Sequence, residues 1–220
     1  MRISILTLFP GMFDGFINES IIKRAIGKGK VSIDIVNIRD FSKLNNNQVD
    51  DTPYGGGAGM VMMCEPVVDA INSVKTDDSK VILMTPAGIP FKQGVAVDLS
   101  KEKHLIIVCG HYEGIDERIL NYIDMEISIG DYVLTGGELA SMVVSDAVIR
   151  LLDGVIRQES YENESFSDNL LDYPVYTKPP VYDGYAVPEV LKNGNHKLIY
   201  EWRRNAQIEK TKERRPDLLD

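Results

Sequence analysis

The chain has 220 residues and a formal net charge of −9, and 44% of it is hydrophobic, which is ordinary for a folded domain or two. Apolar runs such as 105–109 are too short to cross a bilayer, so we expect no membrane partner. The opening segment 1–10 lacks a small-residue cleavage site and predicts a strand, not a signal peptide. Two distant cysteines and three scattered histidines favour a reduced, cytoplasmic setting without a zinc site.

Strands and helices are expected to alternate along the first 152 residues. In chain order the pattern predicts a strand over 3–9, a helix over 12–26, a strand over 31–38, a polar glycine-rich loop over 41–59 and a helix over 66–74. It continues with a strand over 81–85, a helix over 91–99, a strand over 105–109, a short helix over 116–122, a strand over 126–134 and a helix over 138–152. Because continuous apolar strands alternate with helices, we predict an α/β fold with a mainly parallel sheet.

The domain organisation follows from a change of character near residue 154. We expect an α/β domain over 1–154, an acidic linker or lid over 155–169 and a small helical domain over 170–220. Segment 124–172 holds eleven acidic and two basic residues, whereas 173–216 holds nine basic and five acidic ones. A basic tail on an acidic body indicates a surface for an anionic polymer, although a solvated helix face fits the charge equally well.

The segment 128–139 is the most informative part of the chain because it passes from a strand into a helix through Gly136 and Gly137. A helix beginning there would leave backbone N–H groups unpaired, and glycines would let a ligand approach the main chain. Two further loops, 85–88 and 110–114, also follow strands. Ligands bind at the carboxyl ends of parallel strands, so the three loops predict one small-molecule pocket.

Other motifs give weaker evidence of a function. The glycine loop 54–60 fits neither the dinucleotide nor the P-loop template, and a flexible turn explains it. No nucleophile–histidine pattern is present, which leaves a carboxylate base as the candidate chemistry. The side chains that enter this hypothesis are Arg150, Glu164, Asp168 and Asp172. Arg150 also has a structural explanation, as a cation at the C-terminal end of a helix.

Four stretches in order carry a resemblance to a known family. They are 50–60, 112–118, 128–139, and 194–196 together with 214–216. From Met1 to about Leu219 the chain resembles the bacterial tRNA (guanine-N1)-methyltransferases of the TrmD type, in the SPOUT superfamily. The resemblance implies a deep trefoil knot in the α/β domain, S-adenosylmethionine as cofactor, a Mg²⁺ requirement, and a homodimer with shared active sites. It also implies that the substrate is the guanine immediately 3′ of the anticodon in tRNA.

The resemblance assigns roles by motif. The cofactor contacts fall on Leu83, Met84, Thr85, Pro86, Gly110, Tyr112, Glu113, Ile129, Gly130, Tyr132, Leu134, Gly136 and Gly137. The tRNA contacts of the basic tail are expected at Lys197, Arg203, Arg204, Arg214 and Arg215. Glu164 stands where the family has an aspartate as general base, with Asp168 as its rival, and Arg150 matches an arginine that stabilises charge on guanine O6.

Two positions depart from the family pattern. His111 stands where many relatives have arginine, and Ala140 replaces a usual proline. Two other functions remain open at this point. One is a sibling SPOUT enzyme that methylates another RNA position, and the other is a non-enzymatic RNA-binding α/β protein that would need neither Arg150 nor the lid carboxylate.

Overall fold

The computed structural model describes residues 1–157, 164–166 and 168–219, and it divides into two compact units, 1–156 and 157–220. Part of the expected lid, 158–163 and 167, lies outside the described residues. The three-part division at residues 154 and 169 therefore stays a prediction. Among the described residues, no helix combines the length and the apolar character needed to cross a membrane.

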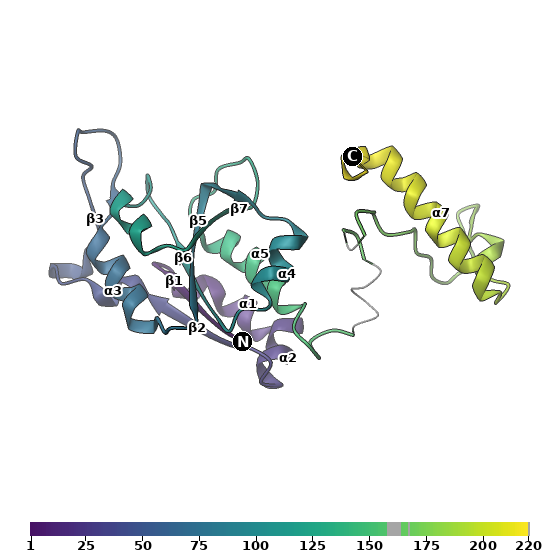
Figure 1. The fold of residues 1–220 in the computed structure, drawn as a ribbon, viewed down its shortest axis with the longest axis horizontal. Helices are drawn as coiled ribbons and strands as arrows, with labels where there is room; N and C mark the ends of the chain where they lie inside the picture. The colour runs from purple at the N-terminus through teal and green to yellow at the C-terminus, as the bar shows by residue number, and fades with distance from the viewer. Residues whose placement is uncertain (158–163, 167, 220) are drawn as a thin grey trace. The chain divides into compact units, whose positions relative to one another are not determined.

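A five-stranded parallel sheet forms the centre of the first unit (Figure 1). Its strands are β1 (Arg2–Thr7), β2 (Ser32–Asn37), β5 (Ser79–Pro90), β6 (His104–Cys109) and β7 (Met125–Ser128). Their order across the sheet is β2-β1-β6-β5-β7, and every neighbouring pair is parallel. The predicted α/β fold with a mainly parallel sheet is confirmed.

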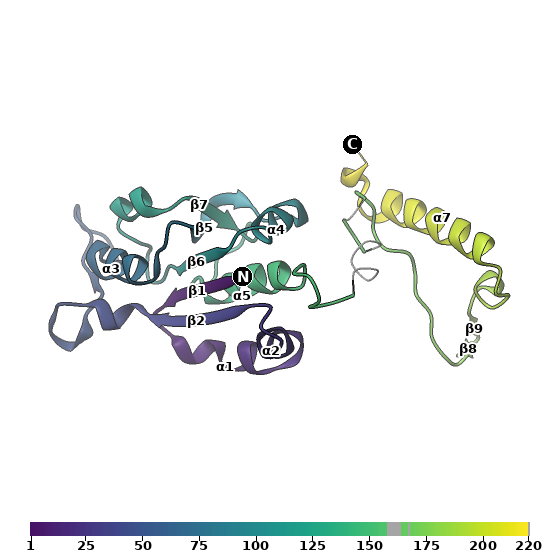
Figure 2. The ribbon, with the colours of Figure 1, turned by 60° about the horizontal axis from the view of Figure 1, so that its bottom comes forward.

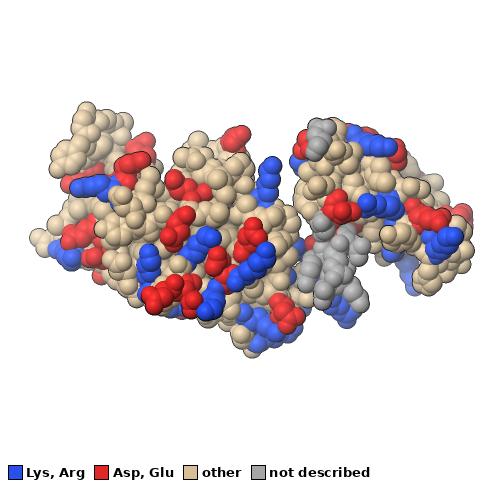
Figure 3. Space-filling view, viewed as in Figure 1, with Lys and Arg blue, Asp and Glu red and all other residues tan. Residues whose placement is uncertain are grey.

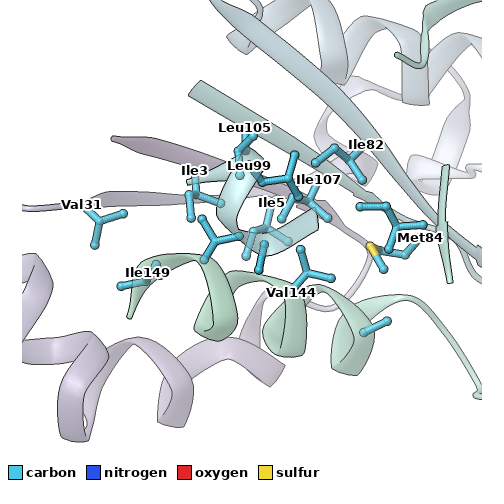
Figure 4. Close-up of a cluster of buried hydrophobic side chains, with 14 of the residues drawn as sticks. Ile3, Ile5, Val31, Ile82, Met84, Leu99, Leu105, Ile107, Val144 and Ile149 are labelled. Carbon is cyan, nitrogen blue, oxygen red and sulfur yellow. The ribbon is translucent and has the colours of Figure 1, made fainter. Parts of the chain in front are cut away.

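Helices cover both faces of this sheet (Figure 2). One layer contains η1 (Pro10–Phe13), α1 (Asp14–Asn18), α2 (Ser20–Gly27), α4 (Gln93–Leu99) and α5 (Glu138–Ile149). The other contains η2 (Ile38–Phe41), α3 (Cys64–Val74) and η4 (Glu117–Tyr122). In the first layer, Val144 of α5 lies on the side chains that β1 and β6 turn toward it, among them Ile5 and Ile107 (Figure 4). Because both faces are buried at the centre of the sheet, β6 is apolar over 105–109, whereas the edge strand β2 keeps Asp34 and Asn37.

Two expected elements differ from the structure near the cavity described below. The predicted strand 126–134 ends at Ser128, because Gly130 takes a φ of 148° and the chain turns away from the sheet. β5 runs on to Pro90 through the expected turn 86–88, with a register shift against β7 between Met84 and Ile89. Gly88 permits this passage, since a Cβ there would lie 2.3 Å from the amide nitrogen of Ile127.

The first helix is also interrupted. The predicted helix 12–26 is η1, α1 and α2 in sequence, because Glu19 is extended and Ser20 takes a φ of 52°. This break lets the last segment turn so that Ile22 and Ala25 reach the core. The polar loop 41–59 contains the short helix η3 (Asn45–Asn47) and the strand β3 (Asp50–Asp51), which pairs with β4 (Val61–Met62). Neither strand was predicted from the sequence.

The second unit is built around α7 (His196–Arg214), which confirms a C-terminal helix. Asn195 caps this helix by accepting a hydrogen bond from the backbone N–H of Leu198. The remaining elements are the hairpin β8 (Val181–Tyr182) and β9 (Tyr185–Ala186), then η5 (Glu189–Leu191) and η6 (Pro216–Leu218). Thr211, buried in α7, accepts a 2.9 Å hydrogen bond from the backbone of Leu171, which attaches the preceding segment to the helix.

Candidate functional site

A cavity of about 310 Å³ lies at the carboxyl ends of β5, β6 and β7. Its lining comes from three separate stretches of chain, 83–86, 110–115 and 127–137, together with Ala140 of α5. The three loops that follow these strands are thus brought to one place, as parallel pairing requires. Its size is at the lower end of the range typical of small-molecule sites.

All thirteen residues expected to contact a cofactor line this single cavity. They are Leu83, Met84, Thr85, Pro86, Gly110, Tyr112, Glu113, Ile129, Gly130, Tyr132, Leu134, Gly136 and Gly137. The two positions that depart from the family pattern, His111 and Ala140, line it as well. The structure shows where these side chains lie, and their contacts with a cofactor stay a prediction.

The glycine pair 136–137 forms the floor of the cavity in a way that the sequence did not indicate. The N–H of Gly137 donates a 2.8 Å hydrogen bond to the carbonyl of Gly110, and Gly136 bridges to His111. A Cβ on Gly137 would lie 2.8 Å from the Cα of Cys109. The expectation of an unpaired amide is therefore wrong for Gly137, since here the glycines let main chain pack on main chain.

Aromatic rings form one wall. Tyr112 takes a left-handed φ of 60°, and its hydroxyl accepts a 3.2 Å hydrogen bond from Arg39. The His111 ring lies between the rings of Phe9 and Tyr112, with centroid distances of 4.8 and 5.0 Å. Glu113 lies beside the glycine loop, because a Cβ on Gly59 would be 2.4 Å from its side chain. The glycine loop 54–60 is thus brought next to the cavity, although the sequence favoured a plain turn.

Two buried groups, the Cys109 thiol and the Glu138 carboxylate, lie behind this floor. Burial raises the pKa of the Cys109 thiol well above its usual value, so this thiol is neutral near pH 7. Glu138 is 2% exposed and accepts a hydrogen bond from Thr7. The sequence analysis assigned no role to Glu138 or Thr7. The position of Glu138 directly after Gly136-Gly137 was the available signal, because an acid in the first turn of a helix is favoured.

The candidate catalytic side chains belong to both units. Arg150 follows the last residue of α5 in the first unit and is half-buried. Glu164 and Asp168 belong to the second unit, where the Asp168 carboxylate forms a 2.9 Å ion pair with Arg204. The backbone N–H of Asp172 donates a 3.0 Å hydrogen bond to the Ser165 hydroxyl. This bond closes a loop that begins directly after Glu164.

The basic residues of α7, and Arg215 directly after it, are partly engaged within their own unit. Arg203 lies 4.7 Å from the ring centre of Tyr173, and Arg204 pairs with Asp168. Arg215 pairs with Asp217 at 2.7 Å, a contact that raises the arginine pKa. Within the described ranges, no ion pair is found for Lys197 or Arg214. On the face drawn in Figure 3, Lys and Arg are interspersed with Asp and Glu.

No group of three or more His, Cys, Asp or Glu side chains in the described part of the chain could hold a metal ion. The fold and the cavity together define the class: a parallel α/β protein whose strand-end loops form a small-molecule site, followed by a helical unit with basic residues.

Comparison with known proteins identifies the family. A family model described as tRNA (Guanine-1)-methyltransferase TrmD matches residues 1–220. A tRNA (guanine-N(1)-)-methyltransferase of Malacoplasma penetrans is 59% identical, over 100% of this chain and 97% of the relative. Proteins of that name from Mycoplasma capricolum subsp. capricolum and Clostridium botulinum (strain 657) are 58% and 56% identical, each over 100% of this chain and 92% of the relative. The chain belongs to the tRNA (guanine-1)-methyltransferase TrmD family.

Proposed function

We propose that this tRNA (guanine-N1)-methyltransferase transfers a methyl group from S-adenosylmethionine to N1 of the guanine immediately 3′ of the anticodon. The match over the whole chain makes it a tRNA methyltransferase by family. The observation that carries the proposal is the convergence of thirteen motif residues, from three strand-end loops, on one cavity of about 310 Å³.

The cavity suits this cofactor by size and by lining. Gly110, Gly130 and Gly136 line it, so at these positions no side chain would keep a nucleoside from the main chain. Apolar side chains such as Leu83 and Leu134 would hold the adenine by burial. When bound, S-adenosylmethionine supplies an electrophilic methyl group on a sulfonium. The described residues contain no cluster of His, Cys, Asp or Glu side chains that fits a Mg²⁺ ion.

A carboxylate of the second unit would remove the proton that guanine N1 carries at neutral pH. We assign this role to Glu164, because it stands directly before Ser165-Phe166, where the family has its aspartate base, and we keep Asp168, which pairs with Arg204, as its rival. The next residue, Ser165, accepts a hydrogen bond from the backbone N–H of Asp172, which would limit the positions open to the base.

Arg150 would stabilise the negative charge that develops on guanine O6 as the proton leaves. A guanidinium presents several N–H donors. Lys197 and Arg214 on α7 would contact tRNA phosphates. Arg203 and Arg204 would exchange their present partners for RNA.

We further propose a homodimer with shared active sites. Leu139 and Val143 are 51% and 48% exposed and lie four residues apart, so they share one face of α5. Two such apolar side chains next to the cavity floor favour a partner surface at this helix.

The path of the chain after β7 bears on the expected knot. β7 lies beside β5, yet Gly136, which follows β7, forms a bridge with His111, just beyond the end of β6. This crossing over a strand end supports the knotted connection that the family resemblance implies.

The test is a methylation assay with radiolabelled S-adenosylmethionine and tRNA transcripts that carry guanine or adenine just 3′ of the anticodon. We expect label only in the guanine transcript, at N1. Glu164→Gln should abolish transfer with tRNA affinity retained, whereas Asp168→Asn, the matched control, should keep most of the activity. Label at a ribose would instead identify a sibling enzyme. Cofactor binding without any transfer would favour a binding protein.

A further inference from the structure

The carboxylate of Glu138 lies directly behind the cavity floor. Glu138 is the first residue of α5, and its Oε1 accepts a 2.8 Å hydrogen bond from the hydroxyl of Thr7, the last residue of β1. Thr7 is 0% exposed and Glu138 is 2% exposed. The N-terminal end of a helix favours a negative charge, but a carboxylate buried without hydrogen bonds is costly. The Thr7 hydroxyl therefore determines where this carboxylate can lie.

The second oxygen of the same carboxylate faces the floor. A Cβ placed on Gly136 would lie 2.4 Å from Oε2 of Glu138 and 2.6 Å from Nδ1 of His111. Both atoms therefore lie next to the position that a side chain on Gly136 would occupy. Gly136 and His111 line the cavity, whereas Glu138 does not. The carboxylate thus supports the floor from behind without reaching a ligand.

Thr7 also connects this support to the aromatic wall. Its hydroxyl oxygen accepts a 2.9 Å hydrogen bond from the backbone N–H of Phe9, and the Phe9 ring packs on His111. Floor and wall are therefore held by one buried hydroxyl that donates to Glu138 and accepts from Phe9. Neither Thr7 nor Phe9 lines the cavity. Buried hydrogen bonds of this kind restrict movement, and the Thr7 hydroxyl makes one on each side, whereas His111 Nδ1 has no hydrogen-bond partner among the described residues.

We propose that Thr7 and Glu138 are positioning residues that hold the floor and wall of the cofactor cavity in their binding geometry. This inference rests on the proposed function, because the cavity is taken as the S-adenosylmethionine site. Removing the Thr7 hydroxyl should weaken cofactor binding without slowing the chemical step, since no reacting group is touched. The loss should be the same for S-adenosylhomocysteine, because a displaced floor affects both molecules alike.

The experiment measures the dissociation constants of both molecules by titration calorimetry, the melting temperature, and kcat at saturating substrates. For Thr7→Val we expect about tenfold weaker binding of both molecules, as for the loss of one hydrogen bond to a charged group. kcat should stay within about twofold, and Thr7→Ser should restore the affinity. Ser145→Ala is the control, since Ser145 is as fully buried as Thr7 but its hydroxyl has no hydrogen-bond partner among the described residues.

Other results would overturn the inference. A lower melting temperature for Thr7→Val with both affinities unchanged would leave Thr7 a purely structural role. Glu138→Gln keeps the shape and can still accept the Thr7 hydrogen bond, so we expect near-normal affinities. If Glu138→Gln weakened S-adenosylmethionine alone, the carboxylate would act by its charge and the positioning role would be wrong. If the wild type bound neither molecule, the proposed function itself would fail.

Discussion

Replacing Gly137 by alanine tests whether main-chain packing at the cavity floor is what holds the site. The added Cβ would lie 2.8 Å from the Cα of Cys109, 3.1 Å from the amide nitrogen of Gly110 and 3.2 Å from the Cβ of Met84. Carbon atoms in contact normally lie about 3.5–4.0 Å apart. None of these three neighbours is the far end of a flexible side chain, so the loop or the end of β6 must move.

Forcing extra atoms into a packed site typically costs about 1–3 kcal/mol. For a unit of 156 residues this corresponds to a melting temperature lower by roughly 2–12 °C. We also expect loss of cofactor binding, because the same glycine lines the cavity. The assays are calorimetric unfolding of the variant and a titration with S-adenosylmethionine at a temperature where it is folded.

Gly94→Ala is the matched control. Gly94 is the second residue of α4, it has no positive φ, and a Cβ there would meet nothing within 4 Å. Alanine at such a helical position should stabilise the protein by about 0.4–1 kcal/mol. If Gly137→Ala melted and bound cofactor as the Gly94 variant does, the packing argument for the floor would be refuted.

Three further predictions concern the rest of the first unit. Burial, and next the charge of Arg2, lower the pKa of His104. Below about pH 6.5 the unfolded state therefore binds more protons than the folded state, and the free energy of unfolding falls. Urea unfolding at about pH 7.5 and about pH 5.5 should show a smaller decrease of this free energy for His104→Asn than for the wild type. If the protein forms the proposed homodimer, Val143→Arg should give a monomer when the mass is measured by light scattering, whereas a dimer of unchanged mass would remove α5 from the interface. Ile107→Ala, at 0% exposure, should cost about 2–5 kcal/mol in the same urea assay, and a loss below about 1 kcal/mol would contradict the core assignment.

Much of the fold could be predicted because local patterns report local structure. Apolar runs such as 105–109 indicate strands buried on both faces, and their alternation with helical spacing indicates a parallel sheet. The positions of the three loops after strand ends could likewise be predicted, since they depend only on element order. The break at Ser20 could not, because it serves the contact of Ile22 with a distant core.

In the candidate site, too, some features could be predicted from the sequence and others depend on contacts between distant segments. The sequence alone determined the motif residues and their order, which suffice for the family and for the strand-end location of the pocket. Only the tertiary structure decided that the Gly137 amide is taken by Gly110, that Asp168 is paired with Arg204, and that Glu138 is buried against Gly136. Each of these facts depends on which distant segments meet. A hydrogen bond or a buried contact joins two segments of the chain, and one stretch of sequence contains only one of the two.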